Sequence, residues 1–165
     1  MLRPLFLALT ALLFAAPAAQ ACTDQPLSKP FTPWLDFAWY QAAPPDWELN
    51  GASVAAGGHP WGGGPESLSI PAGANVVSGP VCITLAHPTL RFFIRGNGVM
   101  AVSIIAGPGL ELPVGVALGS ASWAPSPIVL NVLNLLGEQD VRFRFASVVG
   151  SHRIDDVWID PYSKG

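Results

Sequence analysis

The sequence is poor in charged residues, and this scarcity restricts the partners it can have. Asp, Glu, Lys and Arg make up 12% of the 165 residues, and the formal net charge is −3. Soluble domains usually carry about 25% charged residues. Nucleic-acid-binding domains carry a basic patch or stripe, so the composition excludes a nucleic-acid partner. Because 50% of the residues are hydrophobic, it also excludes a disordered polyelectrolyte.

Long apolar runs are scarce as well. A membrane-spanning helix needs about 20 consecutive apolar residues, and Pro and Gly, 17 of each, interrupt the longer apolar stretches. The run from Leu5 to Ala16 is too short for this purpose; it follows Arg3 and precedes Ala19-Gln20-Ala21. This order is typical of a secretory signal peptide. We therefore expect residues 1–21 to be removed on export and the mature chain to have no transmembrane segment.

Only two cysteines are present, Cys22 and Cys82. Two cysteines in an exported chain pair more often than they stay free, and a Cys22–Cys82 disulfide would contribute about 4 kcal/mol on chain-entropy grounds. A second interpretation is a lipid anchor on Cys22, the first residue after the expected cleavage site. Lipoprotein sites favour Leu three residues before the cysteine, where this chain has Ala19. We favour the disulfide, and lipidation stays open.

Catalytic and zinc-binding signatures are missing. The Gly-x-Ser-x-Gly elbow of hydrolases does not occur, because the similar stretch Gly119–Trp123 lacks the second Gly. His59, His87 and His152 do not have the close spacing of zinc ligands. The paired carboxylates of glycosidases face each other across a cleft, whereas Asp155-Asp156 are neighbours on one expected strand. The sequence predicts no enzyme and no zinc site.

Short apolar stretches separated by Gly, Pro or Asn dominate the rest of the sequence. This pattern predicts an all-β fold, a two-sheet antiparallel jelly-roll β-sandwich over residues 47–162. In 141–145 the Val and both Phe alternate with two Arg, and 90–95 is apolar on both faces, as expected of an inner strand. Asn131–Leu136, followed by Gly137, predicts one short helix near 131–136. The expected strands are Trp47–Ala55, Ser67–Ile70, Val76–Leu85, Leu90–Arg95, Met100–Ile105, Leu112–Leu118, Val141–Val149 and Ile154–Ile159.

Residues 22–46 differ from this pattern because prolines punctuate them. They predict an extended N-terminal arm packed on the body. Its aromatic residues would bury the arm against the sandwich: Phe31, Trp34, Phe37, Trp39 and Tyr40.

Several motifs occur together along the chain: Asp46-Trp47, Asn50-Gly51-Ala52, Ser122-Trp123, an Arg-Phe-Arg-Phe strand and Ile154-Asp155-Asp156-Val157. In this order they resemble the galactose-binding-like jelly rolls of extracellular carbohydrate-binding modules, over residues 40–160. The layout is also similar to that of small secreted bacterial proteins. The resemblance implies a non-catalytic module, secreted, periplasmic or at the cell surface, that binds a carbohydrate or cell-wall polymer.

The acidic pair Asp155-Asp156 has two interpretations. In the family that the chain resembles, such a pair commonly holds a structural calcium ion together with residues near the first strand. The resemblance thus implies a calcium site of Asp155, Asp156 and Gln41, weakened because Gln41 stands where Glu is usual. The alternative, which we favour, gives the pair a role in the fold. Alternation would then place one carboxylate in solvent, and the other would accept backbone N–H groups or pair with Arg91, Arg95 or Arg153.

The Gly-rich loop 57–64 provides the candidate ligand contacts Trp61 and His59. Five glycines among eight residues predict a loose backbone, and an aromatic residue in such a loop is a candidate for binding. The alternative is that Trp61 packs on the edge of the sandwich. A groove beside Trp61 would favour carbohydrate binding. A flat apolar patch would favour the second functional hypothesis, a structural or adhesive surface protein that binds other proteins.

Overall fold

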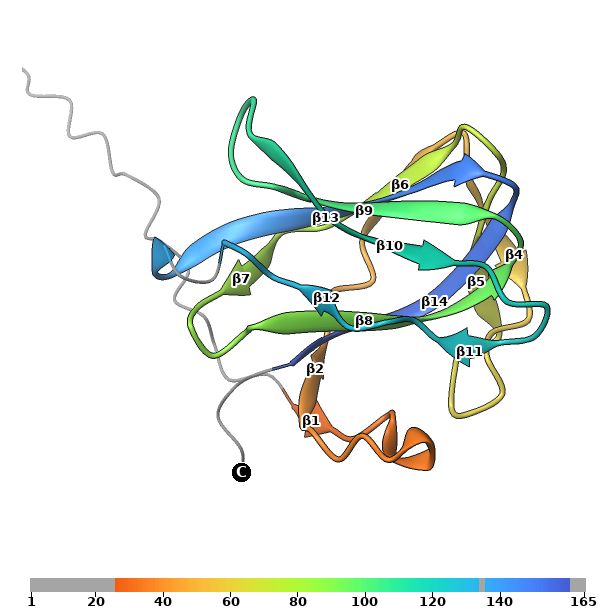
Figure 1. The fold of residues 1–165 in the computed structure, drawn as a ribbon, viewed down its shortest axis with the longest axis horizontal. Helices are drawn as coiled ribbons and strands as arrows, with labels where there is room; N and C mark the ends of the chain where they lie inside the picture. Colours follow the sequence, from red (N-terminus) through yellow and green to blue (C-terminus); the bar gives the residue numbers. More distant parts are fainter. Residues whose placement is uncertain (1–25, 134–135, 161–165) are drawn as a thin grey trace, which may run out of the picture.

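The computed structural model describes residues 26–133 and 136–160, which form two antiparallel sheets packed face to face (Figure 1). The first sheet has eight strands: β1 (Leu27–Ser28), β2 (Tyr40–Ala42), β4 (Ser53–Ala56), β5 (Glu66–Ile70), β8 (Thr89–Gly96), β11 (Ala124–Pro125), β12 (Val129–Leu130) and β14 (His152–Asp160). The second has six: β3 (Trp47–Asn50), β6 (Asn75–Ser78), β7 (Val81–Ile83), β9 (Val99–Ile105), β10 (Glu111–Leu118) and β13 (Gln139–Val149). The predicted all-β, two-sheet sandwich is confirmed.

The main core lies between the two sheets, where the side chains alternate as predicted. In β13, Val141, Phe143 and Phe145 are buried in this core, whereas the two intervening arginines form ion pairs outside it. The strand β8 pairs with β14 and also with β11 and β12. Because β8 has neighbours on both sides, it is an inner strand, as the apolar residues on both of its faces predicted.

Two predicted strands are each divided in the structure. Trp47–Ala55 becomes β3 in the six-stranded sheet and β4 in the eight-stranded sheet. Gly51 permits the change of sheet because it adopts a φ of 77°, a conformation that Gly takes without strain. Val76–Leu85 divides at residues 79–80, where the Gly79 N–H donates to the Asp46 carbonyl. Single strands at these places were therefore wrong.

Other sequence-based predictions fall on residues that the structure does not describe. Residues 134–135 interrupt the segment predicted as a helix, and Val132 and Leu133 before them form a turn. The expected signal peptide and Cys22 also lie outside the described residues. Cys82 is not free, but its pairing with Cys22 stays a prediction. Among the described residues, no helix is long and apolar enough to span a membrane.

The arm covers the outer face of the eight-stranded sheet. Its strand β2 pairs with β14 and with β1, and a short 3-10 helix, η1 (Thr32–Trp34), lies between β1 and β2. The Asp36 carboxylate accepts hydrogen bonds from Tyr40 (2.7 Å) and Arg91 (2.5 Å). The Arg91 guanidinium also lies 4.4 Å from the centre of the Phe31 ring. These contacts fix the arm to β8.

A second apolar cluster fills the space beneath the arm. Phe31 and Tyr40 of the arm and Phe93 of β8 are buried in it, and Trp34, Ala38, Trp123 and Trp158 pack against them. Phe93 therefore points away from the main core, into this outer cluster. The outer cluster gives the loop that follows β4 an apolar surface on which to pack.

Candidate functional site

A β-bulge in the last strand shapes the candidate site. Asp155 pairs with Phe93 and Trp158 pairs with Arg91, so Asp156 and Val157 lie opposite a single residue of β8. Asp156 adopts a φ of 43°, the left-handed conformation that Asp tolerates better than most residues. The extra residue resets the alternation of side chains along the strand. Ile154 and Val157, three residues apart, consequently both enter the main core.

The bulge also turns both carboxylates toward the same residue, His59. The His59 backbone N–H donates to Asp155 Oδ2 (2.8 Å), and Asp156 Oδ2 lies 2.9 Å from His59 Nε2. The expectation that alternation would point the two carboxylates to opposite faces is therefore wrong. Asp155 also accepts the Asp156 N–H, so it is the acceptor of backbone N–H groups that we had considered. Burial raises the pKa of Asp155, against the opposing hydrogen bond from His59.

Both ring nitrogens of His59 have hydrogen-bond partners within the protein. The Trp61 N–H donates to His59 Nδ1 (3.2 Å), so the ring carries its proton on Nε2 and donates it to Asp156. The ring is buried and stacks on Phe93, with 3.8 Å between the ring centres. These contacts make His59 part of the support of the loop.

Glycine makes this close packing possible. A Cβ atom on Gly63 would lie 2.7 Å from Asp155 Oδ2 and from the His59 ring. On Gly58 it would lie 2.5 Å from the same Asp155 oxygen. The backbone ends of the loop also bond to each other, through Gly57 N–H and the Pro65 carbonyl (2.6 Å). Gly58 and Gly63 thus let the loop approach Asp155 closely, so the loop predicted to have a loose backbone is packed against β14.

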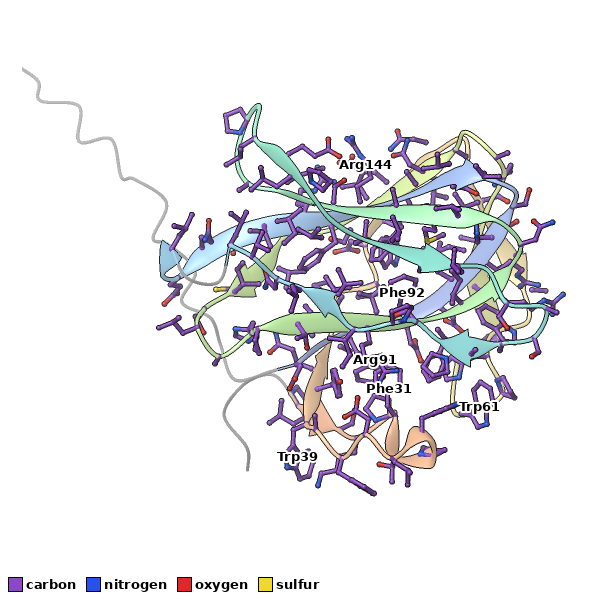
Figure 2. All side chains as sticks on the ribbon, in the orientation of Figure 1. Phe31, Trp39, Trp61, Arg91, Phe92 and Arg144 are labelled. Carbon is purple, nitrogen blue, oxygen red and sulfur yellow. The ribbon has the colours of Figure 1, made fainter. Side chains whose placement is uncertain are left out.

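Trp61 lies at the surface of this assembly (Figure 2). Its side chain is 42% exposed, yet its ring contacts three other rings. The Trp34 ring meets it edge to face at 4.6 Å, while Phe93 and His59 are near-parallel at 5.7 and 6.0 Å. Trp61 is thus neither loose in solvent nor part of the core. It is an exposed aromatic surface that the outer cluster supports from beneath.

The structure does not bring Gln41 to the acidic pair. Gln41 pairs with Ile159, a core residue, so its side chain lies on the core side of the sheet, away from the carboxylates that bond His59. Among residues 26–133 and 136–160, no three His, Cys, Asp or Glu side chains converge on a metal site. The donor set that the resemblance implied, Asp155, Asp156 and Gln41, is not assembled, because the His59 loop occupies the pair.

The outer face of the six-stranded sheet differs from this site because it presents no aromatic residue from its strands. Trp47, Phe143 and Phe145 are the aromatic residues in those strands, and all three pack in or against the main core. The outward side chains include Arg142, Arg144 and several small residues. An aromatic contact with a ligand is therefore available on the opposite sheet, at Trp34 and Trp61.

Sequence reasoning missed two contributors to this site, Trp34 and Phe93. The sequence predicts for Trp34 only a role in burying the arm, and for Phe93 only a place in an inner strand. The signal that could have found them is the run Phe92-Phe93, which places one aromatic residue on each face of β8. An aromatic residue on the outer face of the sheet is exposed to water unless another segment packs on it. The arm, which is rich in aromatic residues, is the segment that buries Phe93.

Comparisons with known proteins support the fold. No protein-family model matches the chain, and no curated protein sequence matches it. Among solved structures, a β-1,3-glucan-binding CBM6 module from Bacillus halodurans is 14% identical, with a TM-score of 0.54, covering 73% of this chain and 94% of that one.

Two further structures are similar in the same way. A mutant of the carbohydrate-binding module CBM29-2 has a TM-score of 0.51 at 14% identity, covering 76% and 94% of the two chains. The CBM22-1 and GH10 modules of a Clostridium thermocellum xylanase give a TM-score of 0.53 at 12% identity, covering 71% and 26%. The resemblance to the jelly-roll fold of carbohydrate-binding modules is thereby confirmed, and at these identities it is a likeness of fold.

Proposed function

We propose that this chain is a non-catalytic binding module, exported from a bacterial cell, that recognises a carbohydrate or cell-wall polymer through Trp61. The observation that carries the proposal is an exposed indole on a fixed support. Sugar rings have an apolar face that packs on aromatic side chains, and a rigid aromatic contact costs little ordering entropy on binding. Trp61 meets both conditions, because the outer cluster and the His59 hydrogen bonds hold its loop.

Two further observations support the proposal. The solved structures with this fold include a β-1,3-glucan-binding module and a xylan-degrading enzyme that carries a CBM22 module. The candidate site itself contains a network of His, Asp and aromatic side chains whose atoms bond to one another. In this network His59, Asp155 and Asp156 support the loop. This role needs no catalytic function for them, which supports a non-catalytic module.

A glycan-array screen of residues 22–165 tests the proposal. We expect retention on one or a few polysaccharides and loss of that retention in a Trp61→Ala variant. Absence of binding across bacterial and plant polysaccharides would contradict it.

A second candidate function, binding of another protein, has one observation in its favour. Val116 and Leu118 of β10 are 59% and 67% exposed, and they pair with Ala101 and Val99 of β9 on the outer face of the six-stranded sheet. This apolar patch lies away from Trp61. If it were the functional surface, Leu118→Asp would abolish surface attachment while Trp61→Ala would leave it unchanged.

A further inference from the structure

Arg95 differs from the other arginines because it has no partner. Among residues 26–133 and 136–160 there are five arginines, and three of them form ion pairs with carboxylates. A fourth, Arg153, donates hydrogen bonds to the carbonyls of Ala56 and Gly57 and to the Ser67 hydroxyl. Arg95 is exposed, and within these residues it forms neither an ion pair nor a hydrogen bond. Its guanidinium is therefore available to a ligand.

A second arginine lies directly beside Arg95 on the outer face of the eight-stranded sheet. Arg95 of β8 pairs with Arg153 of β14, and directly opposed residues of antiparallel strands project from the same face. Like charges in this arrangement destabilise a sheet. No carboxylate in the described part of the chain pairs with Arg95 to offset the repulsion. A bound anion would offset it.

Arg95 is continuous with the aromatic surface of Trp61. Phe93, which lies 5.7 Å from the Trp61 ring between ring centres, is two residues before Arg95 in β8. The two side chains therefore share a face and are about 7 Å apart along the strand. Trp123 packs against the same outer cluster, and the Arg153 guanidinium lies 5.8 Å from the centre of its ring. The outer face thus combines an exposed indole with an unpaired cation.

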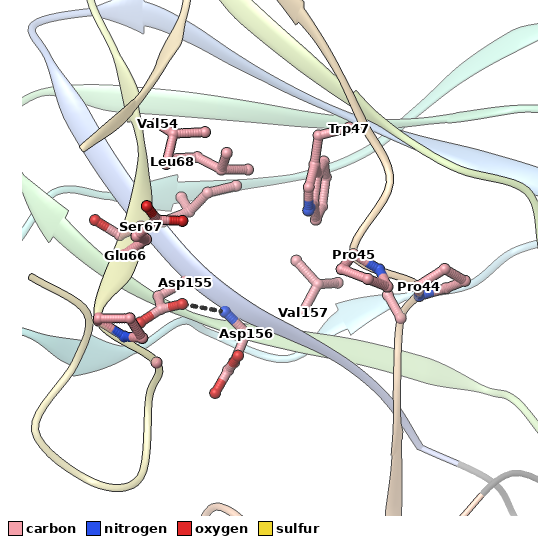
Figure 3. A pocket seen from close by; sticks show the side chains of 14 residues that line it. Pro44, Pro45, Trp47, Val54, Glu66, Ser67, Leu68, Asp155, Asp156 and Val157 are labelled. Atoms are coloured by element: carbon pink, nitrogen blue, oxygen red, sulfur yellow. Dashed lines mark hydrogen bonds between the residues drawn. The ribbon is translucent and has the colours of Figure 1, made fainter. Parts of the chain in front are cut away.

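The acidic residues close to Trp61 already have partners within the protein. Asp155 accepts the Asp156 N–H, as Figure 3 shows, and also the His59 N–H. Asp156 contacts the His59 ring, and Asp36 of the arm pairs with Arg91. These carboxylates support the loop and the arm, so they do not neutralise Arg95.

We propose that the polysaccharide recognised at Trp61 is acidic, and that Arg95 binds an anionic group on a sugar unit near the one stacked on Trp61. The guanidinium presents a planar fork of N–H donors that matches carboxylate and phosphate oxygens. Uronic acids, sulfate esters and phosphodiesters of a glycan share this chemistry. The inference rests on the proposed carbohydrate binding at Trp61 and adds the charge of the ligand.

Polymers that differ in charge test the proposal. Polygalacturonate is compared with its neutral, carboxyl-reduced form, dextran sulfate with dextran, and a glycerol phosphate teichoic acid supplies phosphate. We expect at least one acidic polymer to bind tenfold or more tightly than the neutral polymers, and the polymer that binds identifies the anionic group. This affinity should fall with rising salt, which screens exposed charges. Neutral polymers binding as tightly, or no acidic polymer binding, would overturn the proposal, whereas retention of neutral glycans on the array would leave the function of Trp61 standing.

Two arginine variants with the same change in net charge locate the contact. Arg95→Ala should weaken binding of the acidic polymer about fivefold, as expected for one exposed charge pair. Its melting temperature should not fall, because the repulsion from Arg153 is removed. Arg144→Ala, on the six-stranded sheet, is the matched control and should keep the parent affinity. Equal affinities in the two variants, or an unchanged affinity in Arg95→Ala, would contradict the assignment.

Discussion

The imidazole of His59 lies parallel to the ring of Phe93, with 3.8 Å between their centres and 21° between their planes. This stack connects a Gly-rich loop to the centre of the eight-stranded sheet. Asp155 accepts the backbone N–H of the same histidine, and Asp156 contacts its ring Nε2. Trp61, two residues later, therefore sits on a support that is already ordered, and a ligand that stacks on it does not have to order the loop.

Removal of the His59 side chain should release the loop. His59→Ala loses the stack on Phe93 and the contact with Asp156, and it leaves a cavity beside buried rings. We expect a loss of about 2–4 kcal/mol in unfolding free energy, measured by urea denaturation, together with weaker polysaccharide retention. Full stability and full retention in this variant would show that His59 does not position Trp61.

Two neighbouring glycines offer a matched test of loop packing. A Cβ on Gly63 would overlap Asp155 and His59, whereas nothing lies within 4 Å of one on Gly64. Gly63→Ala should therefore destabilise the protein by about 1–3 kcal/mol, and Gly64→Ala should be nearly neutral. Thermal unfolding compares the two, and equal melting temperatures would mean that the loop is not packed on Asp155.

The contribution of the Asp156 backbone conformation to stability can be measured separately from that of its carboxylate. Asp156→Ala and Asp156→Gly both lose the contact with His59, but only Ala carries a Cβ into the left-handed conformation. We expect the Gly variant to be more stable than the Ala variant by about 1 kcal/mol. Equal unfolding free energies would indicate that the bulge relaxes when the carboxylate is lost.

Buried histidines should make the protein sensitive to mild acid. Burial lowers the pKa of His152 and of His87. A lowered pKa means that the unfolded chain binds the proton more readily, so their contribution is complete above a pH of about 6.5 and declines below it. Urea midpoints of the parent should therefore fall between pH 7.5 and pH 5.5. His152→Gln should show a shallower fall, and an identical pH dependence in both proteins would contradict this assignment.

The sequence predicted the sandwich and its inner strand because the alternation in 141–145 and the apolar residues on both faces of 90–95 are local properties that burial confirms. The predicted orientation of the Asp155 and Asp156 side chains was wrong, because the strand contains a bulge at this point. The extra residue of the bulge reverses the face on which each later side chain of the strand lies. It also failed for the loop at 57–64. Two of the five glycines there, Gly58 and Gly63, allow close contact with Asp155, a residue almost 100 positions away along the chain. No local pattern reports such a contact.

Trp61 itself was recognised from sequence as a candidate, since an aromatic residue among glycines has no strand to bury it. Its support was not recognised, because Trp34 comes from the arm, His59 from the loop and Phe93 from β8. These residues meet only once the arm has folded over the sheet.

The most direct test of carbohydrate binding compares Trp61→Ala with Trp39→Ala on a polysaccharide that retains the parent. Trp39 is a partly buried tryptophan of the arm, with Lys29 over its ring, and it lies away from Trp61 (Figure 2). We expect Trp61→Ala to keep most of its thermal stability and lose at least tenfold in affinity, while Trp39→Ala keeps its affinity. Equal affinity in the parent and in Trp61→Ala would contradict the account.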